Sequence, residues 1–266
     1  MNGWNRNMAD FLDVLARDAQ NTISEGYYEV SAQGLFSDVS LKEAIVESED
    51  NVVITEVKAA SPSRGIIKDD FEPDEVARAM ENGGAVGISV LTEPKHFRGS
   101  LGYFAKVRKA VKLPILMKDI VISQIQLETA SKIGANVVLL IKTFFERGYC
   151  ESSLEEMISQ AHKKNLEVLL ETHSENEFQY AIETDADLIG INNRDLGTLK
   201  INLGITERIL KKCNSHGKII VSESGVMTVD DLLFLRNCGA QAFLIGSAVM
   251  MADNIEKKVK EFVAAY

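Results

Sequence analysis

The chain has 266 residues, 45% of them hydrophobic, so it can form a sizeable core in one large domain or two small ones. Its formal charge of −10, from 29 Lys and Arg against 39 Asp and Glu, argues against a general nucleic-acid-binding protein. Three widely spaced cysteines fit no disulfide framework, and no apolar run predicts a membrane span or a signal peptide, so we expect a cytoplasmic protein.

The N-terminal residues predict two helices. An amphipathic pattern predicts a helix over Asn7–Gln20. Ser40, with Glu43 three residues later, predicts the start of a short helix over Leu41–Glu47. We expect residues 1–48 to form an N-terminal helical extension of a catalytic domain that spans residues 49–266.

The first strand is predicted over Val52–Val57, a β-branched run. Because side chains alternate along a strand, Ile54, Glu56 and Lys58 share one face, and the opposite face suits packing against helices. The loop at 61–65 that follows is rich in small turn-forming residues and hydrogen-bond donors, as an anion site requires. A Glu and a Lys side by side can serve acid–base chemistry, and a simple ion pair at the strand end is the alternative.

Apolar runs of strand length then alternate with helix-like segments to the end of the chain. The predicted strands are Val52–Val57, Val86–Leu91, Ile115–Met117, Val137–Ile141, Val168–Leu170, Leu188–Ile191, Ile219–Val221 and Phe243–Ile245. The predicted helices are Pro73–Asn82, Leu101–Ala110, Ser123–Ile133, Ser153–Lys164, Glu175–Glu183, Gly204–Cys213, Val229–Cys238 and Ala252–Val263. Gly134, after one of these helices, predicts a left-handed C-cap.

Near-continuous apolar strands that alternate with helices predict a parallel sheet covered by helices. Eight such repeats in about 250 residues match a single (β/α)8 TIM barrel. A doubly wound open sheet is the alternative, but it usually carries a GxGxxG turn after the first strand, and this sequence has none.

The ionisable residues gather where the predicted strands end, which is the active-site end of such a barrel. The residues delivered there are Glu56, Lys58, Ser61, Phe97, Lys118, Lys142, Glu171, Asn192, Arg194, Glu223, Ser224, Gly225, Gly246 and Ser247. The opposite strand ends carry turn residues with little ionisable variety, as expected when a site is built on one end of a barrel.

Glycines after the last two predicted strands, Gly225 and Gly246, favour a phosphate site, because these loops commonly bind phosphate through backbone N–H groups. Ordinary strand–helix turns are the alternative. Arg194 could add a bidentate contact, although a lone Arg on a rim is more often solvated. Phe97 could either line a pocket for an aromatic ring or pack its own loop. The histidines are scattered without metal-ligand spacing, so we expect no metal site.

These segments together resemble the indole-3-glycerol-phosphate synthase family of tryptophan biosynthesis. The matching motifs are Glu56-Val-Lys58 with Ser61-Pro-Ser63, Leu91-Thr-Glu-Pro-Lys95 with Phe97, Pro114-Ile-Leu-Met-Lys-Asp119, Leu170-Glu171, Gly190-Ile-Asn192 with Arg194-Asp-Leu196, Ser222-Glu-Ser-Gly225 and Phe243-Leu-Ile-Gly-Ser247. The resemblance implies a cytoplasmic carboxy-lyase that cyclises, decarboxylates and dehydrates 1-(2-carboxyphenylamino)-1-deoxyribulose 5-phosphate without a cofactor.

The resemblance also implies roles. Lys118 would protonate the substrate carbonyl or its leaving oxygen, and Lys58 would bind the carboxylate or act as the acid in dehydration, with Glu171 and Glu56 as acid–base partners. The residues implied to orient the substrate are Asn192, Glu223 and Ser224; those implied to hold the phosphate are Ser61, Arg194, Gly225, Gly246 and Ser247; and Phe97 would border the ring. Both lysines need a lowered pKa to cycle near neutral pH, and we expect crowded cations and partial burial to supply it.

Two other functions compete with this lyase: another phosphosugar-binding barrel, such as an isomerase, and a non-catalytic barrel that acts as a scaffold. The combination of Glu56, Lys58, Lys118 and Glu171 argues against the isomerase, and the intact ionic residues at every predicted strand end argue against the scaffold. The expected partner is a small phosphorylated anthranilate–sugar substrate, with neither nucleic acid nor membrane involved. We expect a monomer or a weak homodimer, and association with other tryptophan-pathway enzymes stays open.

Overall fold

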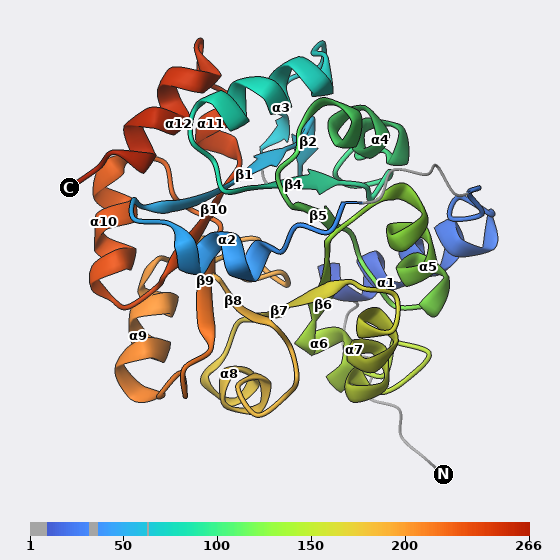
Figure 1. The fold of residues 1–266 in the computed structure, drawn as a ribbon. Coiled ribbons are helices and arrows are strands. Elements are labelled where there is room, and N and C mark those ends of the chain that lie inside the picture. Colours follow the sequence, from blue (N-terminus) through green and yellow to red (C-terminus); the bar gives the residue numbers. More distant parts are fainter. Residues whose placement is uncertain (1–9, 32–36, 63) are drawn as a thin grey trace.

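The computed structural model describes residues 10–31, 37–62 and 64–266, and in this part of the chain eight parallel strands close into a barrel. Around the barrel the strands follow in the order β1, β4, β5, β6, β7, β8, β9 and β10, and β10 pairs again with β1. Helices cover the outside of the barrel (Figure 1). The predicted (β/α)8 fold is confirmed, and the doubly wound open sheet is excluded.

Every predicted apolar run overlaps one barrel strand. The strands are β1 (Val52–Val57), β4 (Gly87–Leu91), β5 (Ile115–Lys118), β6 (Val137–Ile141), β7 (Glu167–Thr172), β8 (Leu188–Asn192), β9 (Ile219–Glu223) and β10 (Ala242–Ile245). The helices between and after them include α3 (Pro73–Asn82), α4 (Leu101–Ala110), α5 (Gln124–Ile133), α7 (Leu154–His162), α8 (Glu175–Ala181), α9 (Gly204–Lys212), α10 (Val229–Asn237) and α12 (Ile255–Val263). Gly134 has φ +84° and caps α5 in the predicted left-handed conformation.

The apolar side chains form two cores, one on each face of the closed sheet. Val53 and Val57 of β1 belong to the core between the barrel and its helices. Ile54 belongs to the core inside the barrel, with Leu169 and Leu244 from other strands. The alternation predicted for the first strand is therefore confirmed, and it is what turns Glu56 and Lys58 toward the end of the barrel interior.

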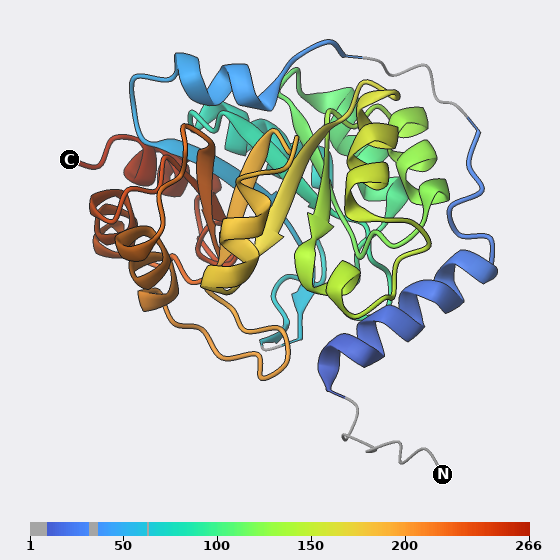
Figure 2. The same ribbon diagram turned by 90° about the horizontal axis from the view of Figure 1, so that it is seen from below.

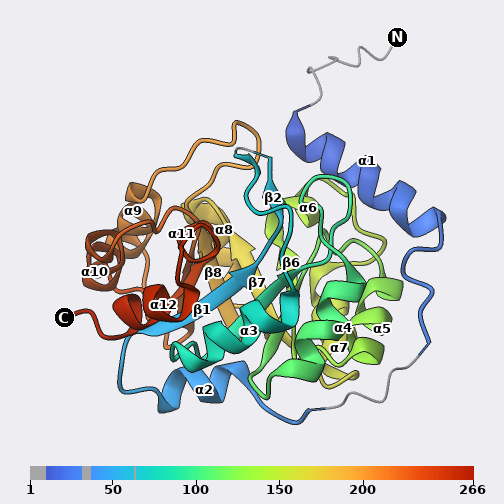
Figure 3. The same ribbon diagram turned by 90° about the horizontal axis from the view of Figure 1, so that it is seen from above.

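The two N-terminal helices lie at opposite ends of the barrel (Figures 2 and 3). Helix α1 (Phe11–Ser24) lies at the end where the strands finish, and its buried residues include Leu12 and Leu15. Helix α2 (Leu41–Glu47) lies at the other end, where Ser40 accepts a hydrogen bond from the Glu43 backbone at 3.0 Å, as the cap prediction expected. The predicted residues 7–9 of the first helix lie outside the described part.

Short elements that the sequence pattern did not predict complete the active-site end. They are the hairpin of β2 (Ala60–Ser61) and β3 (Gly65–Ile66), and the helices α6 (Lys142–Glu146) and α11 (Ser247–Met250). Each directly follows or closely follows a barrel strand, so it shapes the rim of the site. Among the described residues, no helix combines the length and apolar character needed to cross a bilayer.

Candidate active site

A pocket with an empty volume of about 1030 Å³ lies at the C-terminal ends of the barrel strands. It is lined by every residue to which the family resemblance assigns a role: Glu56, Lys58, Ser61, Phe97, Lys118, Glu171, Asn192, Arg194, Glu223, Ser224, Gly225, Gly246 and Ser247. Of the residues expected at this end, Lys142 lies elsewhere: it begins α6, pairs with Glu146 at 3.0 Å, and its ammonium group lies 4.1 Å from the centre of the Tyr180 ring. All eight barrel strands, or the loops after them, therefore contribute residues to the pocket. Lys142 is not one of these residues.

Two lysines and three carboxylates meet at the floor of this pocket. Lys58 Nζ lies 2.7 Å from Glu56 Oε1. Lys118 Nζ lies 2.6 Å from Glu223 Oε2 and 3.4 Å from Glu171 Oε2. The carboxylates are almost fully buried, so their interactions with the ammonium groups are only weakly screened by solvent.

The charges around Lys118 set its protonation. Burial by itself lowers the pKa of Lys118, but the carboxylates of Glu223, Glu171 and Glu56 outweigh burial, and the pKa is raised. The expectation of a lowered pKa is therefore wrong for Lys118, because anions rather than cations surround it. Burial raises the pKa of Glu223 to about 7, although Lys118 beside it has the opposite effect. Lys118 is thus held as an ammonium donor next to a carboxyl group whose pKa burial raises.

A turn directly after β9 contributes Ser224 and Gly225 to the lining of the pocket. Ser224 has φ +66° and Gly225 has φ +95°, which is the left-handed conformation. A Cβ atom at Gly225 would lie 2.7 Å from Ile201 Cγ2, so only glycine fits there without displacing that side chain. In the same pocket, the Ser61 hydroxyl oxygen is buried and has no hydrogen-bond partner among the described residues. An unpartnered hydroxyl in a pocket is available to a ligand.

Asn193, which sequence reasoning missed, holds this turn from behind. Its side-chain NH2 group donates to the backbone oxygens of Glu223 and Ser224, both at 3.1 Å, and to Ser222 Oγ at 2.9 Å. Its side-chain oxygen accepts from Thr206 Oγ1 at 2.8 Å. The whole side chain is buried, so this network fixes the backbone that carries the left-handed Ser224.

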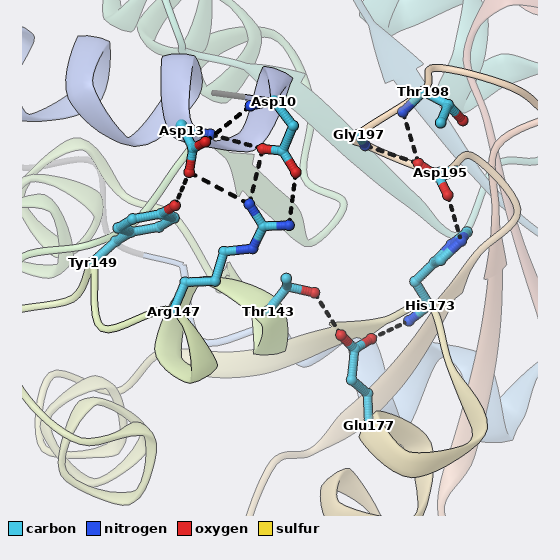
Figure 4. Close-up of polar contacts among 10 residues, drawn as sticks. All are labelled: Asp10, Asp13, Thr143, Arg147, Tyr149, His173, Glu177, Asp195, Gly197 and Thr198. Atoms are coloured by element: carbon cyan, nitrogen blue, oxygen red, sulfur yellow. Dashed lines mark hydrogen bonds and ion pairs between the residues drawn. The ribbon is translucent and has the colours of Figure 1, made fainter. Parts of the chain in front are cut away.

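Helix α1 supplies an apolar wall that the sequence alone did not predict. Phe11 and Leu15 line the pocket together with Phe97. Arg147 donates to Asp10, the N-cap of α1, at 2.7 and 2.8 Å and so holds the start of this helix over the barrel (Figure 4). The N-terminal extension is therefore part of the pocket.

His173 follows β7 and lies beside the site. Its Nδ1 lies 2.8 Å from the Asn192 backbone oxygen, and its Nε2 lies 3.6 Å from Asp195 (Figure 4). Asp195 in turn accepts hydrogen bonds from the backbone of Gly197 and Thr198. His173 thus braces the loop after β8, which is a structural role.

Asp119, next to Lys118, is a further buried carboxyl group, to which the sequence analysis assigned no role. It accepts hydrogen bonds from Tyr28 Oη at 2.9 Å, from Thr92 Oγ1 at 2.5 Å and from the Ile120 backbone at 2.8 Å. Burial raises the pKa of Asp119 to about 7, although the hydrogen bonds from Thr92 and Tyr28 counteract this rise. Because Tyr28 follows α1, this group also ties the N-terminal segment to the strand that carries Lys118.

The variant Asp119→Asn is expected to flatten the dependence of stability on pH. A carboxyl group with a raised pKa keeps its proton in the folded state, so the wild-type free energy of unfolding falls as the pH rises from about 4 to about 7. This one group lowers the free energy of unfolding by at most roughly 4 kcal/mol over that pH range. Urea denaturation across this range measures it; parallel curves for the two proteins would show that Asp119 does not titrate in this way.

Comparisons with known proteins identify the family of the chain. A sequence model described as Indole-3-glycerol phosphate synthase matches residues 12–262. Proteins named indole-3-glycerol phosphate synthase are similar: that of Caldanaerobacter subterraneus subsp. tengcongensis is 42% identical over 79% of each chain, and that of Acetivibrio thermocellus is 36% identical over 94% of this chain and 95% of the relative. The one from Methanocaldococcus jannaschii is 43% identical over 80% of this chain and 78% of its own.

Solved structures with little sequence similarity share the fold. A thiamine phosphate pyrophosphorylase from Pyrococcus furiosus superposes with a TM-score of 0.59 at 17% identity, over 84% of this chain and 96% of its own. An N-acetylmannosamine-6-phosphate 2-epimerase from Clostridium perfringens gives 0.59 at 13% identity, over 79% of this chain and 90% of its own. At such identities the likeness supports the barrel fold alone.

Proposed function

Because the chain belongs to the indole-3-glycerol phosphate synthase family, we propose that its pocket converts 1-(2-carboxyphenylamino)-1-deoxyribulose 5-phosphate into indole-3-glycerol phosphate, CO2 and water. The observation that carries this proposal is the position of the Lys118–Glu171–Glu223 cluster, in a pocket that also has an apolar wall and the left-handed turn at Ser224 and Gly225. The substrate needs all three features: the ionic cluster for its reacting ketone, the apolar wall for its aromatic ring and the turn for its phosphate.

In the first step, the ring carbon that bears the carboxylate attacks the ketone carbon, and a carbon–carbon bond forms. The ketone oxygen takes a proton from Lys118, whose raised pKa keeps it protonated until the substrate accepts the proton. The bond to the carboxylate then breaks, CO2 leaves, and its electron pair restores the aromatic ring. Positioning the ring against the ketone removes part of the entropic barrier to closure.

In the second step, the hydroxyl group formed from the ketone leaves as water. Lys58, held by Glu56 at 2.7 Å, donates the proton that this hydroxyl needs, and Glu171 accepts a proton from the neighbouring CH2 group. The electron pair of that C–H bond forms the double bond of the indole. One proton is given and one is taken, so the step is balanced, and the ionic cluster returns to its charge after proton exchange with water.

The phosphate is proposed to lie against the turn at Ser224–Gly225 and the start of α11 at Gly246 and Ser247, with Ser61 and Arg194 at its sides. The left-handed turn and the unpartnered Ser61 hydroxyl support this placement. The guanidinium group of Arg194 lines the same pocket and donates to the Leu199 backbone at 3.2 Å.

The direct test is a steady-state assay with this substrate. The reaction is monitored through the fluorescence of the indole product and through the release of CO2. We expect both products in equal amounts. A folded protein that leaves the substrate unchanged would contradict the proposed function.

The variant Arg194→Ala is expected to raise KM by roughly ten- to a hundredfold, because a charge-assisted hydrogen bond to the phosphate is worth about 1.5–3 kcal/mol. Its kcat should change little, since the contact is the same in the ground state and the transition state. Steady-state kinetics separate the two constants, and an unchanged KM would remove Arg194 from the phosphate site.

A further inference from the structure

Strand β8 carries a glycine inside the barrel at the place where a side chain from β9 crosses it. Gly190 pairs with Glu171 of β7 on one side and with Val221 of β9 on the other. A Cβ atom added at Gly190 would overlap Glu223 Oε1 and lie 3.3 Å from Glu223 Cδ. The carboxylate of Glu223 therefore occupies the space that any side chain at position 190 would need.

Space, and not backbone conformation, is what this position requires. Gly190 is absent from the residues with positive φ in the described chain, so an alanine could adopt its backbone without strain. Its nearest backbone neighbour across the strands, Glu171 Cα, would be 3.4 Å from the added atom, which is an ordinary contact. Only the end of Glu223 would have to move.

The overlapping carboxylate is the one that contacts Lys118. Glu223 Oε2 lies 2.6 Å from Lys118 Nζ, while Oε1 is buried without a hydrogen-bond partner among the described residues. Oε1 is thus held in place by the packing around it and by the bond that Oε2 makes. A shift of the carboxylate away from Gly190 would pull Oε2 out of its contact with the lysine.

We propose that Gly190 is a positioning residue for the reaction: by lacking a side chain, it lets the Glu223 carboxylate lie against Lys118 and keep that ammonium group aimed at the substrate ketone. The inference rests on the proposed function of Lys118. It adds a residue that touches no substrate and acts through Glu223.

The test uses wild type, Gly190→Ala, Glu223→Asp and the double variant Gly190→Ala/Glu223→Asp in the steady-state assay. Aspartate is shorter by one methylene, so its carboxylate leaves room for an alanine side chain. We expect Gly190→Ala to lower kcat by about ten- to a hundredfold with KM within about threefold. In the Glu223→Asp background, the same alanine should lower kcat by less than about threefold.

A matched control is Gly87→Ala in β4. Its Cβ atom would lie 2.6 Å from Leu41 Cδ1, in α2 at the opposite end of the barrel, so it also creates a clash inside a barrel strand. Both alanine variants should lower the melting temperature, but only Gly190→Ala should lower kcat. A loss of kcat of equal size in both variants would overturn the inference.

The outcomes separate the inference from the proposed function. No turnover by the wild type would overturn both. If the wild type turns over and Gly190→Ala lowers kcat by the same factor with Glu223 and with Asp at position 223, only the inference is overturned. If Gly190→Ala does not fold, the clash with Glu223 predicts that the double variant does fold. A double variant that also fails to fold would overturn the inference.

Discussion

Replacing Lys118 by alanine is expected to lower kcat by roughly two to four orders of magnitude, which is the range that a positioned general acid contributes. The reason is its place between Glu223 and Glu171, which keeps it protonated at the point where the ketone oxygen must receive a proton. KM should change much less, because the phosphate and ring contacts remain. Steady-state kinetics on purified protein measure both constants.

The same variant should also make stability more dependent on pH. Burial already raises the pKa of Glu223, and the Lys118 ammonium group opposes this rise. Without that ammonium group, Glu223 keeps its proton to a still higher pH in the folded state. The free energy of unfolding should therefore fall more steeply with rising pH than in the wild type. Chemical denaturation at several pH values tests this.

Lys142→Ala is the matched control for Lys118→Ala. Lys142 is also a buried lysine at the end of a barrel strand, but its partners are Glu146 and the Tyr180 ring outside the pocket. We expect its kcat to stay within about twofold of the wild type. A near-normal kcat for Lys118→Ala, or an equal loss for Lys142→Ala, would contradict the role of Lys118.

Replacing Glu171 by glutamine is expected to lower kcat by roughly 10²- to 10³-fold, since an amide keeps the shape of the carboxylate but cannot accept a proton. Glu171 is the penultimate residue of β7 and lines the pocket, 3.4 Å from Lys118 Nζ. Because the substrate's ring and phosphate contacts are unaffected, KM should stay within a few-fold. Rapid kinetics should show the intermediate that precedes loss of water accumulating in this variant.

Glu167→Gln provides the comparison on the same strand. Glu167 begins β7 at the other end of the barrel, where it accepts hydrogen bonds from Ser40 and from the Leu41 backbone at the start of α2. Its loss should cost about 0.5–1.5 kcal/mol of unfolding free energy and leave kcat unchanged. If the two variants lost kcat equally, the reaction would not depend on which end of the strand carries the carboxylate.

The barrel and the floor of the pocket could be predicted because their signals are local. Each strand is a run of apolar residues, and alternation along β1 puts Glu56 and Lys58 on the same face as Ile54. The barrel rule then brings the strand ends together. No long-range information is needed for either step.

The supports of the site could not be predicted, because their partners are far apart in the sequence. Tyr28 and Asp119 are 91 residues apart, and nothing in the pattern around Tyr28 indicates their contact. Lys142 was placed at the rim because it follows an apolar run. However, α6 begins at Lys142, and its side chain contacts Glu146 and the Tyr180 ring outside the pocket. Asn193 looks like an ordinary loop residue until its bonds to the backbone of the β9 turn are seen.

The extension at residues 1–48 shows the same limit. Its helices were predicted from amphipathicity and capping. Helix α1 continues four residues past Gln20, to Ser24, because tertiary packing buries Thr22. The Thr22 hydroxyl also donates a hydrogen bond to the Asp18 backbone oxygen. Its contribution of Phe11 to the pocket depends on the distant Arg147. We propose that the extension and the barrel, residues 49–266, act as one catalytic unit.

The most direct test of the central claim is a crystal structure of the protein with a substrate analogue in which the ketone is reduced to an alcohol. We predict that the alcohol oxygen lies within hydrogen-bond distance of Lys118 Nζ, the aromatic ring lies against Phe97, and the phosphate contacts the backbone of Gly225 and Ser247. An analogue bound with its phosphate near Lys118, or bound outside this pocket, would contradict the account.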